Sequence, residues 1–141
     1  MLDETDRKIL SLLKKDSRMQ FAEIGKKVHL SAPAVHARVK KMEANNIIRG
    51  YTIDINPVAL DAGLCAFVRI GKGKGTSADV AKELIKLKQV EECHGVAGED
   101  CLMVKLRASS TLELSKLIDH VRGIEGIERT LTVVVLSLIH I

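Results

Sequence analysis

Apolar residues recur at helical spacing in the first part of the chain. A helix is predicted over residues 3–15, where Asp3 can cap the first turn, acids follow it and lysines lie near the end. Its apolar face consists of Ile9, Leu10, Leu12 and Leu13. A second helix is predicted to begin near Phe21, and it presents Phe21, Ile24 and Val28 on one face.

A third helix is predicted after a short connection. Ser31 is a suitable N-cap, and Pro33 is tolerated because it falls in the first turn of a helix. Val35, Val39 and Met42 follow at spacings of four and three residues, so they should face the other two helices. A short helix, a tight turn and a longer basic helix are typical of a helix-turn-helix, which lays its second helix in the major groove of DNA.

The pattern becomes strand-like after residue 50. Residues 51–55 alternate between apolar and polar side chains and predict a strand, which ends at Pro57. Further elements follow in the order strand, helix, strand, strand, helix, strand. The strands are predicted at residues 64–70, 90–96, 101–106 and 127–138, and the helices at residues 77–88 and 111–121. Ser77 and either Ser110 or Thr111 are expected to cap the two helices.

This order of elements predicts the split β-α-β arrangement of a ferredoxin-like domain. The fold class is therefore α+β, with a C-terminal βαββαβ domain built on a four-stranded antiparallel sheet. Both helices should cover one face of this sheet, and no other segment is predicted to cover the opposite face. An apolar sheet face without a cover commonly becomes a subunit interface, so we expect a homo-oligomer.

The excess positive charge of the chain lies in its first part. Residues 1–60 hold 11 Lys and Arg against 7 Asp and Glu, whereas residues 61–141 hold 11 of each. A basic segment joined to a neutral one suggests a polyanion-binding domain attached to a domain with another task. Aromatic residues make up only 2% of the chain, which argues against modules that stack RNA or single-stranded bases on aromatic rings.

The remaining composition indicates a cytoplasmic protein. The charged start is unlike a signal peptide, and no apolar run approaches the roughly 20 residues that a membrane helix needs. Cys65, Cys93 and Cys101 are irregularly spaced, which suits a reducing compartment and gives no disulfide framework.

The outward face of the third helix carries two groups of candidate DNA contacts. The candidates for reading base edges are Ser31, Ala32, Pro33 and His36, and the candidates for binding phosphates are Arg38, Lys40 and Lys41. Phosphate contacts would position the protein on the duplex and make its affinity depend on salt. A solvated helix face is the other explanation of these charges, but the spacing, turn and cap all agree with a DNA-binding helix.

Other motifs give little indication of chemistry. The glycine- and lysine-rich segment at residues 71–75 lies between a strand and a helix but lacks both phosphate-loop spacings. Alternation along a strand points Cys93 and His94 to opposite faces, so these residues and Cys101 are not expected to hold a metal ion. No nucleophile elbow, H-E-x-x-H motif or convincing carboxylate pair is present. We therefore expect no metal, no cofactor and no enzymatic activity.

A hairpin over residues 95–100 connects the second and third strands of the C-terminal domain. Glycines with an acid at a hairpin tip are usually only turn residues. Exposed backbone groups and a carboxylate at such a tip could also hold the ammonium group of a small zwitterion.

These segments together resemble the Lrp/AsnC (leucine-responsive, "feast/famine") family of transcriptional regulators. LDETDRKILSLLKKDSR is similar to the first helix of the family, and EIGKKVHLSAPAVHARVKKMEANNIIRGYTIDINP is similar to its helix-turn-helix and linker strand. VEECHGVAGEDCLMVKL resembles the family's G-x-x-D hairpin, and GIERTLTVVVL resembles its final strand. The resemblance covers essentially the whole chain and the order of its elements.

The resemblance implies a winged helix-turn-helix DNA-binding domain over residues 1–50, a linker strand over residues 51–60 and an effector-binding and oligomerisation domain over residues 61–141. Family members dimerise through their C-terminal sheets and often form tetramers or octamers, so the expected partner is a pseudo-palindromic double-stranded operator. Their effectors, typically amino acids, bind between dimers near the G-x-x-D hairpin. The residues that match this effector site are Gly98, Asp100, Thr132, Val133 and Val134.

Two other functions remain open at the level of sequence. Some sirohaem decarboxylases resemble this family and are enzymes, but they should carry basic or histidine side chains in a C-terminal pocket. Here His94 and His120 show no obvious pairing, and the basic residues lie on the predicted third helix. An architectural DNA-binding protein without an effector is the second alternative.

Overall fold

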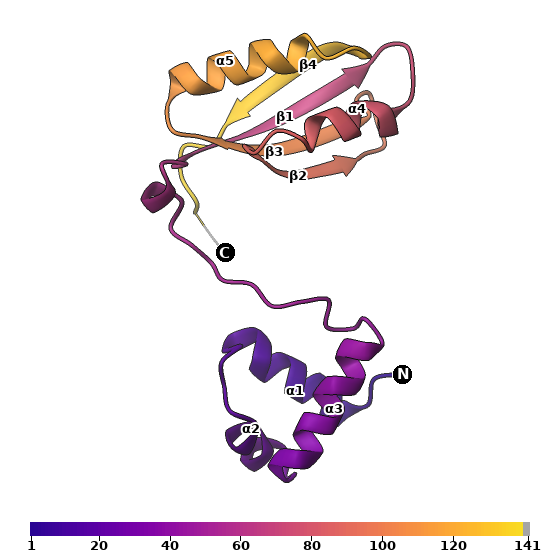
Figure 1. Ribbon diagram of the computed structural model, residues 1–141, viewed down its shortest axis with the longest axis vertical. Helices are drawn as coiled ribbons and strands as arrows, with labels where there is room; N and C mark the ends of the chain where they lie inside the picture. The colour runs from indigo at the N-terminus through magenta and orange to yellow at the C-terminus, as the bar shows by residue number, and fades with distance from the viewer. Residues whose placement is uncertain (140–141) are drawn as a thin grey trace. The chain divides into compact units, whose positions relative to one another are not determined.

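The computed structural model describes residues 1–139 and divides the chain into two compact units. The first unit is Met1–Asp54 and the second begins at Ile55. The first unit is helical, whereas the second combines a sheet with two helices, which confirms the predicted α+β fold class (Figure 1).

Three helices form the first unit: α1 (Glu4–Lys15), α2 (Phe21–Val28) and α3 (Ala32–Ala44). Asp3 caps α1 as predicted, because its side chain accepts a hydrogen bond from the backbone N–H of Asp6, whose own carboxylate accepts one from the N–H of Asp3. The predicted apolar faces meet in one core. Its buried members are Ile9, Leu13, Ile24, Val35, Val39 and Met42.

The turn between α2 and α3 depends on a glycine inside α2. His29 ends α2 in the left-handed region with φ 58°, and the N–H of Leu30 donates to the carbonyl of Gly25 at 2.9 Å. A Cβ atom on Gly25 would lie only 2.3 Å from the carbonyl oxygen of Leu30. The tight turn of the helix-turn-helix therefore requires glycine at this position.

Two sequence-based expectations for the region around the first unit are wrong. Met1–Asp54, all of it described, contains helices but no strand, so the expected wing is absent from this unit. The expected linker strand at residues 51–60 is extended chain followed by a short 3-10 helix (η1, Pro57–Leu60). The alternating pattern of this segment is typical of a strand with one apolar and one polar face. A strand also needs a hydrogen-bonding neighbour, and none of residues 1–139 pairs with this segment.

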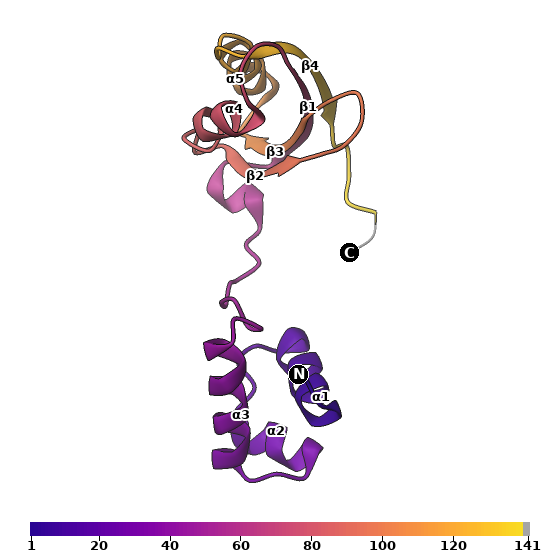
Figure 2. The same cartoon turned by 90° about the vertical axis from the view of Figure 1, so that its right-hand side faces the viewer.

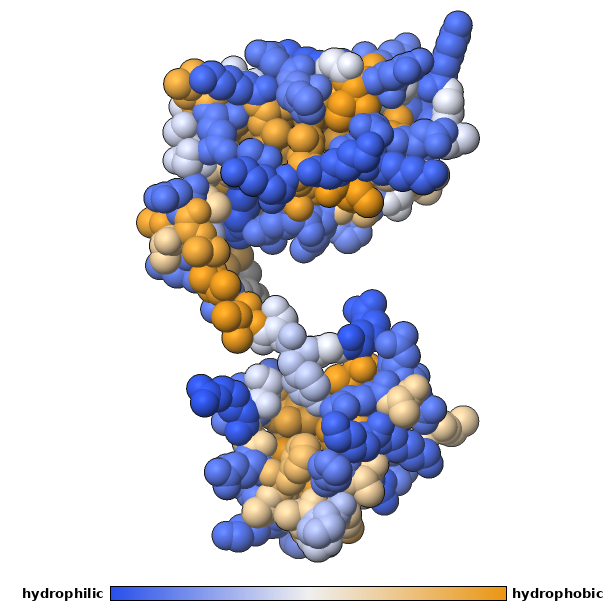
Figure 3. Space-filling model, viewed as in Figure 1, coloured by the Kyte–Doolittle hydropathy of each residue, from blue (hydrophilic) through white to orange (hydrophobic). Residues whose placement is uncertain are grey.

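Hydrophobic side chains gather along this segment after α3 and remain open to solvent (Figure 3). The exposed members are Tyr51, Ile53, Ile55, Val58 and Leu60. Ile53 retains 76% of its accessible surface, which is unusual for a large apolar side chain in the middle of an alternating pattern.

A four-stranded antiparallel sheet with the order β2-β3-β1-β4 forms the second unit. Its elements are β1 (Leu64–Lys72), α4 (Ser77–Leu84), β2 (Val90–Gly95), β3 (Leu102–Ala108), α5 (Thr111–Arg122) and β4 (Ile127–Val134). Both helices lie on one side of the sheet, as predicted (Figure 2). The core between sheet and helices is entirely apolar, with Ala66, Val68 and Ile70 of β1 at its centre.

One helix cap and several element boundaries differ from the sequence-based expectation. Thr76 rather than Ser77 caps α4, because its Oγ1 accepts from the N–H of Asp79 at 3.2 Å. The helix ends at Leu84, four residues earlier than predicted. β4 ends at Val134 instead of residue 138, close to the start of β1 at Leu64. The N–H of Val135 still donates to the carbonyl of Cys65 at 2.9 Å, and β1 extends only one residue further in that direction. Ser110, one of the two alternatives, caps α5.

The face of the sheet opposite the helices has no cover within the described chain. We call it the open face, and its β1 positions are Cys65, Phe67, Arg69 and Gly71, which alternate with the core residues. Leu131 and Val133 of β4 lie on the same face, beside Arg69 and Phe67 in the register, and are 53% and 52% exposed. The prediction of an uncovered sheet face with apolar residues is confirmed. No helix among residues 1–139 is long and apolar enough to cross a membrane.

We expect Gly25→Ala to destabilise the first unit by about 1–3 kcal/mol, because the added methyl group meets the carbonyl oxygen of Leu30. Alanine normally stabilises a helix interior relative to glycine by about 1 kcal/mol, so the sign of the effect is diagnostic. Denaturant unfolding followed by circular dichroism measures it. Gly50→Ala is the matched control, because an added Cβ there meets nothing within 4 Å. A Gly25→Ala protein as stable as the control would contradict the proposed turn packing.

Candidate nucleic-acid interface and ligand site

The outward side of α3 carries most of the predicted DNA contacts. Ser31, Pro33, His36, Lys40 and Lys41 are exposed, and Ala32 is half-buried. The Oγ atom of Ser31 accepts a hydrogen bond from the N–H of Ala34 at 3.3 Å and thereby caps the helix. This arrangement leaves the N-terminal end of α3 open to a ligand, as a helix that enters the major groove requires.

His36 is positioned by a contact with α2. The centroid of its ring lies 5.5 Å from that of Phe21, with an interplanar angle of 58°. Such a tilted contact restrains the direction of the imidazole without burying it. His36 is therefore held at the edge of α3 next to α2.

Arg38 has partners other than the phosphates predicted for it. Its Nη1 atom lies 2.7 Å from Oδ2 of Asp3 and 2.9 Å from Oδ1 of Asp6. Arg38 borders the buried side of α3, next to Val39, so it faces α1 rather than the outward side. The hydrogen bond from Arg38 lowers the pKa of Asp3, and the N–H of Asp6 adds to this effect. The geometry assigns Arg38 to the packing of α3 on α1.

Lys40 and Lys41 differ in their surroundings. Nζ of Lys40 lies 3.4 Å from Glu43, whose carboxylate also accepts a hydrogen bond of 2.9 Å from the hydroxyl of Tyr51. Lys41 forms no ion pair with any residue of the described chain. Lys41 is thus the member of the predicted phosphate-binding group whose charge remains uncompensated.

Sequence reasoning did not consider three exposed residues of α2 and α3. Ala37 is exposed between Pro33 and Lys41, and its small side chain lets another molecule approach the helix closely. Lys26 and Lys27 are exposed in the last turn of α2. Because the first helix of a helix-turn-helix crosses the DNA backbone, their position relative to α3 could have indicated phosphate contacts.

Asp100 lies at the end of the hairpin between β2 and β3 and is held by two arginines. Its side chain is only 9% exposed. Nε and Nη2 of Arg69 both lie 2.7 Å from Oδ2, and Nε and Nη2 of Arg129 both lie 3.2 Å from Oδ1. Burial raises the pKa of the Asp100 carboxyl, but the hydrogen bonds from the two arginines outweigh burial and lower the pKa overall.

The predicted effector residues do not all gather around Asp100. Gly98 is in the same hairpin with φ 141°, a conformation that favours glycine. Thr132, Val133 and Val134 lie three to five residues beyond Arg129 on β4, or roughly 10–17 Å along the strand. Only Val133 shares the open face with Arg129, because Thr132 and Val134 pair with Val68 and Ala66, whose side chains face the core. Their role in binding an effector stays a prediction for an assembled protein.

The two arginines were not identified from the sequence. Arg69 and Arg129 are 31 and 29 residues from Asp100, on β1 and β4. Strand alternation could have indicated them. It places both arginines on the uncovered face, at the end of the sheet next to the hairpin between β2 and β3.

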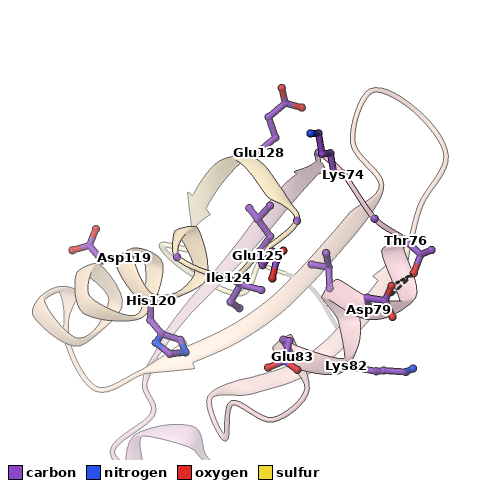
Figure 4. Close-up of a pocket in the computed structure, with 16 residues that line it drawn as sticks. Lys74, Thr76, Asp79, Lys82, Glu83, Asp119, His120, Ile124, Glu125 and Glu128 are labelled. Carbon is purple, nitrogen blue, oxygen red and sulfur yellow. Dashed lines mark hydrogen bonds between the residues drawn. The ribbon is translucent and has the colours of Figure 1, made fainter.

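A hollow of about 1160 Å³ lies between α4, α5 and the segment before β4 (Figure 4). Its floor is apolar, with Val80, Ile124 and Ile127. The charged residues on its rim, such as Asp119, Lys82 and Glu128, point away from one another, and Thr76 and Asp79 bond to each other. This hollow lacks convergent polar groups, so it is not the candidate site.

Cys93 and His94 diverge as expected from strand alternation. Cys93 packs against the apolar core, where burial raises the pKa of its thiol, and His94 is exposed with its Nε2 2.9 Å from Glu92. Residues 1–139 contain no cluster of three or more His, Cys, Asp or Glu side chains that could hold a metal ion.

Comparison with known proteins defines the class of this protein. The sequence profile of the AsnC-type helix-turn-helix domain matches residues 2–43, and that of the Lrp/AsnC ligand binding domain matches residues 65–140. These matches and the fold define a helix-turn-helix transcriptional regulator with a C-terminal ligand-binding domain. The chain belongs to the Lrp/AsnC family.

Individual relatives are similar over nearly the whole chain. HTH-type transcriptional regulator FL11 of Pyrococcus abyssi is 36% identical over 136 residues, covering 96% of this chain and 90% of the relative. Bacillus subtilis LrpB is 34% identical over 118 residues, covering 84% and 79%. The solved structure of Bacillus subtilis LrpC has a TM-score of 0.90 at 30% identity, covering 99% and 98%. A transcriptional regulator from Neisseria meningitidis, solved as a complex with L-Met, has a TM-score of 0.93 at 28% identity, covering 99% and 93%.

We expect Arg38→Gln to reduce the acid sensitivity of the first unit. Because the pKa of Asp3 is lower in the folded protein, its ion pair contributes stability above the ordinary value of 3.8 and loses it as the pH falls below that value. Without Arg38 this loss should be smaller, although the hydrogen bond from Asp6 remains. Unfolding midpoints from neutral pH down to about pH 2 measure the effect.

Arg18→Gln is the control for this measurement, because Arg18 is exposed and its side chain forms no bond with the described residues. Identical pH profiles for Arg38→Gln and Arg18→Gln would show that the ion pair between α1 and α3 does not contribute to stability in solution.

Proposed function

We propose that this protein is a sequence-specific regulator that binds double-stranded DNA through α3 and responds to a small effector, an amino acid, bound at an oligomer interface. The observation that carries the DNA-binding part is the exposed N-terminal end and outward face of α3, with Pro33, Ala37 and Lys41 free of partners within the described chain. A solvated helix would not need to combine an open N-terminus with an uncompensated lysine on the same side.

The effector part of the proposal rests on the second unit. Its match to a ligand-binding domain supports a ligand at this unit, and the relative from Neisseria meningitidis was solved with L-Met. The hairpin with Gly98 and Asp100 is the proposed place, because it combines a glycine in a conformation that other residues rarely adopt with a nearly buried carboxylate at the edge of the open face.

The oligomeric part of the proposal rests on the open face. Phe67, Leu131 and Val133 form an apolar stripe across β1 and β4 that nothing in the described chain covers. Pairing two such faces in a homodimer would remove the stripe from water and give the DNA-binding units two-fold symmetry. A pseudo-palindromic operator follows from that symmetry, and tetramers or octamers would place further hairpins side by side.

We expect Lys41→Ala to weaken binding to duplexes of any sequence and to reduce the salt slope of log K by about 1, because a phosphate contact is lost. A preferred duplex sequence is first selected from random DNA with the wild-type protein. Gel-shift titrations of this duplex and of random DNA over a range of salt concentrations then measure the affinity and the salt slope. His36→Ala should instead change the selected sequence. Lys116→Ala, an exposed lysine on α5, is the control. An unchanged salt slope for Lys41→Ala would contradict the proposal that α3 binds DNA through this face.

We expect Val133→Asp to convert the dimer into a monomer, because it places a charge in the middle of the apolar stripe. Sedimentation velocity measures the change in mass. Leu112→Asp is the control, since Leu112 is 65% exposed at the start of α5, on the other side of the sheet. A Val133→Asp protein with unchanged mass would show that the open face is not the dimer interface.

A further inference from the structure

We infer that Arg69 and Arg129 form an anion site that binds the carboxylate of the effector, and that Asp100 positions these arginines instead of binding the effector's ammonium group. The inference rests on the proposed function, which places the effector at this hairpin.

Asp100 has no remaining capacity to bind a ligand's ammonium group. A carboxylate offers about four lone-pair sites, and four N–H-bearing nitrogens of Arg69 and Arg129 lie within 3.2 Å of its two oxygens. The side chain is also only 9% exposed. An ammonium group could reach this carboxylate only by displacing an arginine.

Asp100 is the one carboxylate among the described residues that pairs with either arginine of the cluster. Two guanidinium groups face one carboxylate. Elsewhere on the open face the acids Glu91 and Glu92 pair with Lys105, Arg107 and His94. Both arginines hold the hairpin, and two guanidinium groups on one carboxylate leave a net positive charge at this site that a ligand of negative charge would balance.

Both arginines keep donors available on an accessible surface. Their bonds to Asp100 use Nε and Nη2, and Nη1 of neither arginine has an acceptor among residues 1–139. The side chains are 40% and 59% exposed. A guanidinium presents its remaining N–H groups in a planar fork that matches the geometry of a carboxylate.

The sheet contains a specific accommodation for Arg129. A Cβ atom on Gly71 would lie 2.7 Å from Cγ and 2.8 Å from Nε of Arg129, so the arginine crosses β1 where no side chain is present. Gly71 and Arg129 face each other in the register of β1 and β4. Nη2 of Arg129 also donates to the carbonyl of Glu99 at 2.9 Å. Glycine inside a strand weakens it, so its use here indicates that the direction of Arg129 matters.

The first test compares ligands that differ by one charged group. The full-length protein is titrated by calorimetry with the common amino acids, and each one that binds is compared with its α-amide and with the acid that lacks the amino group. For leucine these are leucinamide and 4-methylpentanoate. We expect the deaminated acid to bind within about 10-fold of the amino acid and the amide to bind on the order of 10- to 100-fold more weakly. An amide that binds as well as the amino acid overturns the inference.

The second test uses variants of the site. Arg69→Gln and Arg129→Gln should each weaken binding of the amino acid, and Arg129→Lys should weaken it less because it keeps the charge but loses the fork. Gly71→Ala should weaken it without touching the ligand, because the added methyl group displaces Arg129. Arg107→Gln is the control, since Arg107 pairs with Glu91 on the same face. Circular dichroism checks that each variant is folded.

Asp100→Asn separates the positioning role from direct ligand binding. If Asp100 only orients the arginines, the ratio of affinities for an amino acid and its deaminated acid stays the same in this variant. If Asp100 binds the ammonium group, the two ligands become equally weak and the inference is wrong.

Failure of this inference can be distinguished from failure of the proposed function. If an amino acid binds equally well to Arg69→Gln, Arg129→Gln and wild type, the anion site is wrong, but the proposal of a regulator that responds to an amino acid still stands. If no amino acid and no deaminated acid binds, both the anion site and the effector response are wrong. The salt dependence of the Lys41→Ala variant judges DNA binding independently of either result.

Discussion

Both helices of the second unit lie on one face of its four-stranded sheet, and the rest of this unit depends on that arrangement. α4 and α5 enclose an apolar core on one side and leave β1 and β4 open on the other. Everything on the open face must therefore be stabilised by contacts within the sheet or by another molecule. The same face provides the apolar stripe with Phe67 and the charged cluster around Asp100, so the proposed association and the proposed ligand recognition would share one surface.

In the first unit, contacts on the inner side of α3 fix its position and leave its outer side exposed. Apolar contacts hold α3 from behind through Val35 and Val39, and Arg38 ties its flank to the capped start of α1. These contacts use side chains that point away from the proposed DNA surface. Outward side chains such as Ala37 and Lys41 form no bond or ion pair within the described chain, which suits a surface whose sequence can change with its operator.

The sequence predicted the elements of this fold well because each one follows from local patterns. The apolar spacing and the caps at Asp3, Ser31 and Ser110 define where helices begin, and alternation defines the faces of β1 and β3. Prediction was weaker where an element depends on a neighbour. Residues 51–55 alternate like a strand but have no neighbour to pair with among residues 1–139, and β4 ends close to the start of its antiparallel neighbour β1.

The candidate sites were predicted less completely, because partners distant in sequence decide what a charged side chain does. Arg38 has the charge and spacing of a phosphate contact, but two carboxylates of α1 compete for it. Asp100 was correctly placed on a hairpin, yet its arginine partners come from two other strands. Helical and strand periodicity give the direction of a side chain from its own backbone, and they carry no information about what lies opposite.

The crossing of Arg129 over Gly71 couples two positions that are 58 residues apart in the chain. A larger residue at position 71 would clash with the side chain of Arg129. A chain without Arg129 would no longer need glycine there. Within the family, glycine at the position of Gly71 should therefore accompany arginine at the position of Arg129, and the two residues should be lost together. Such covariation would divide the family into members that keep a guanidinium at the hairpin and members that recognise their effectors by other means.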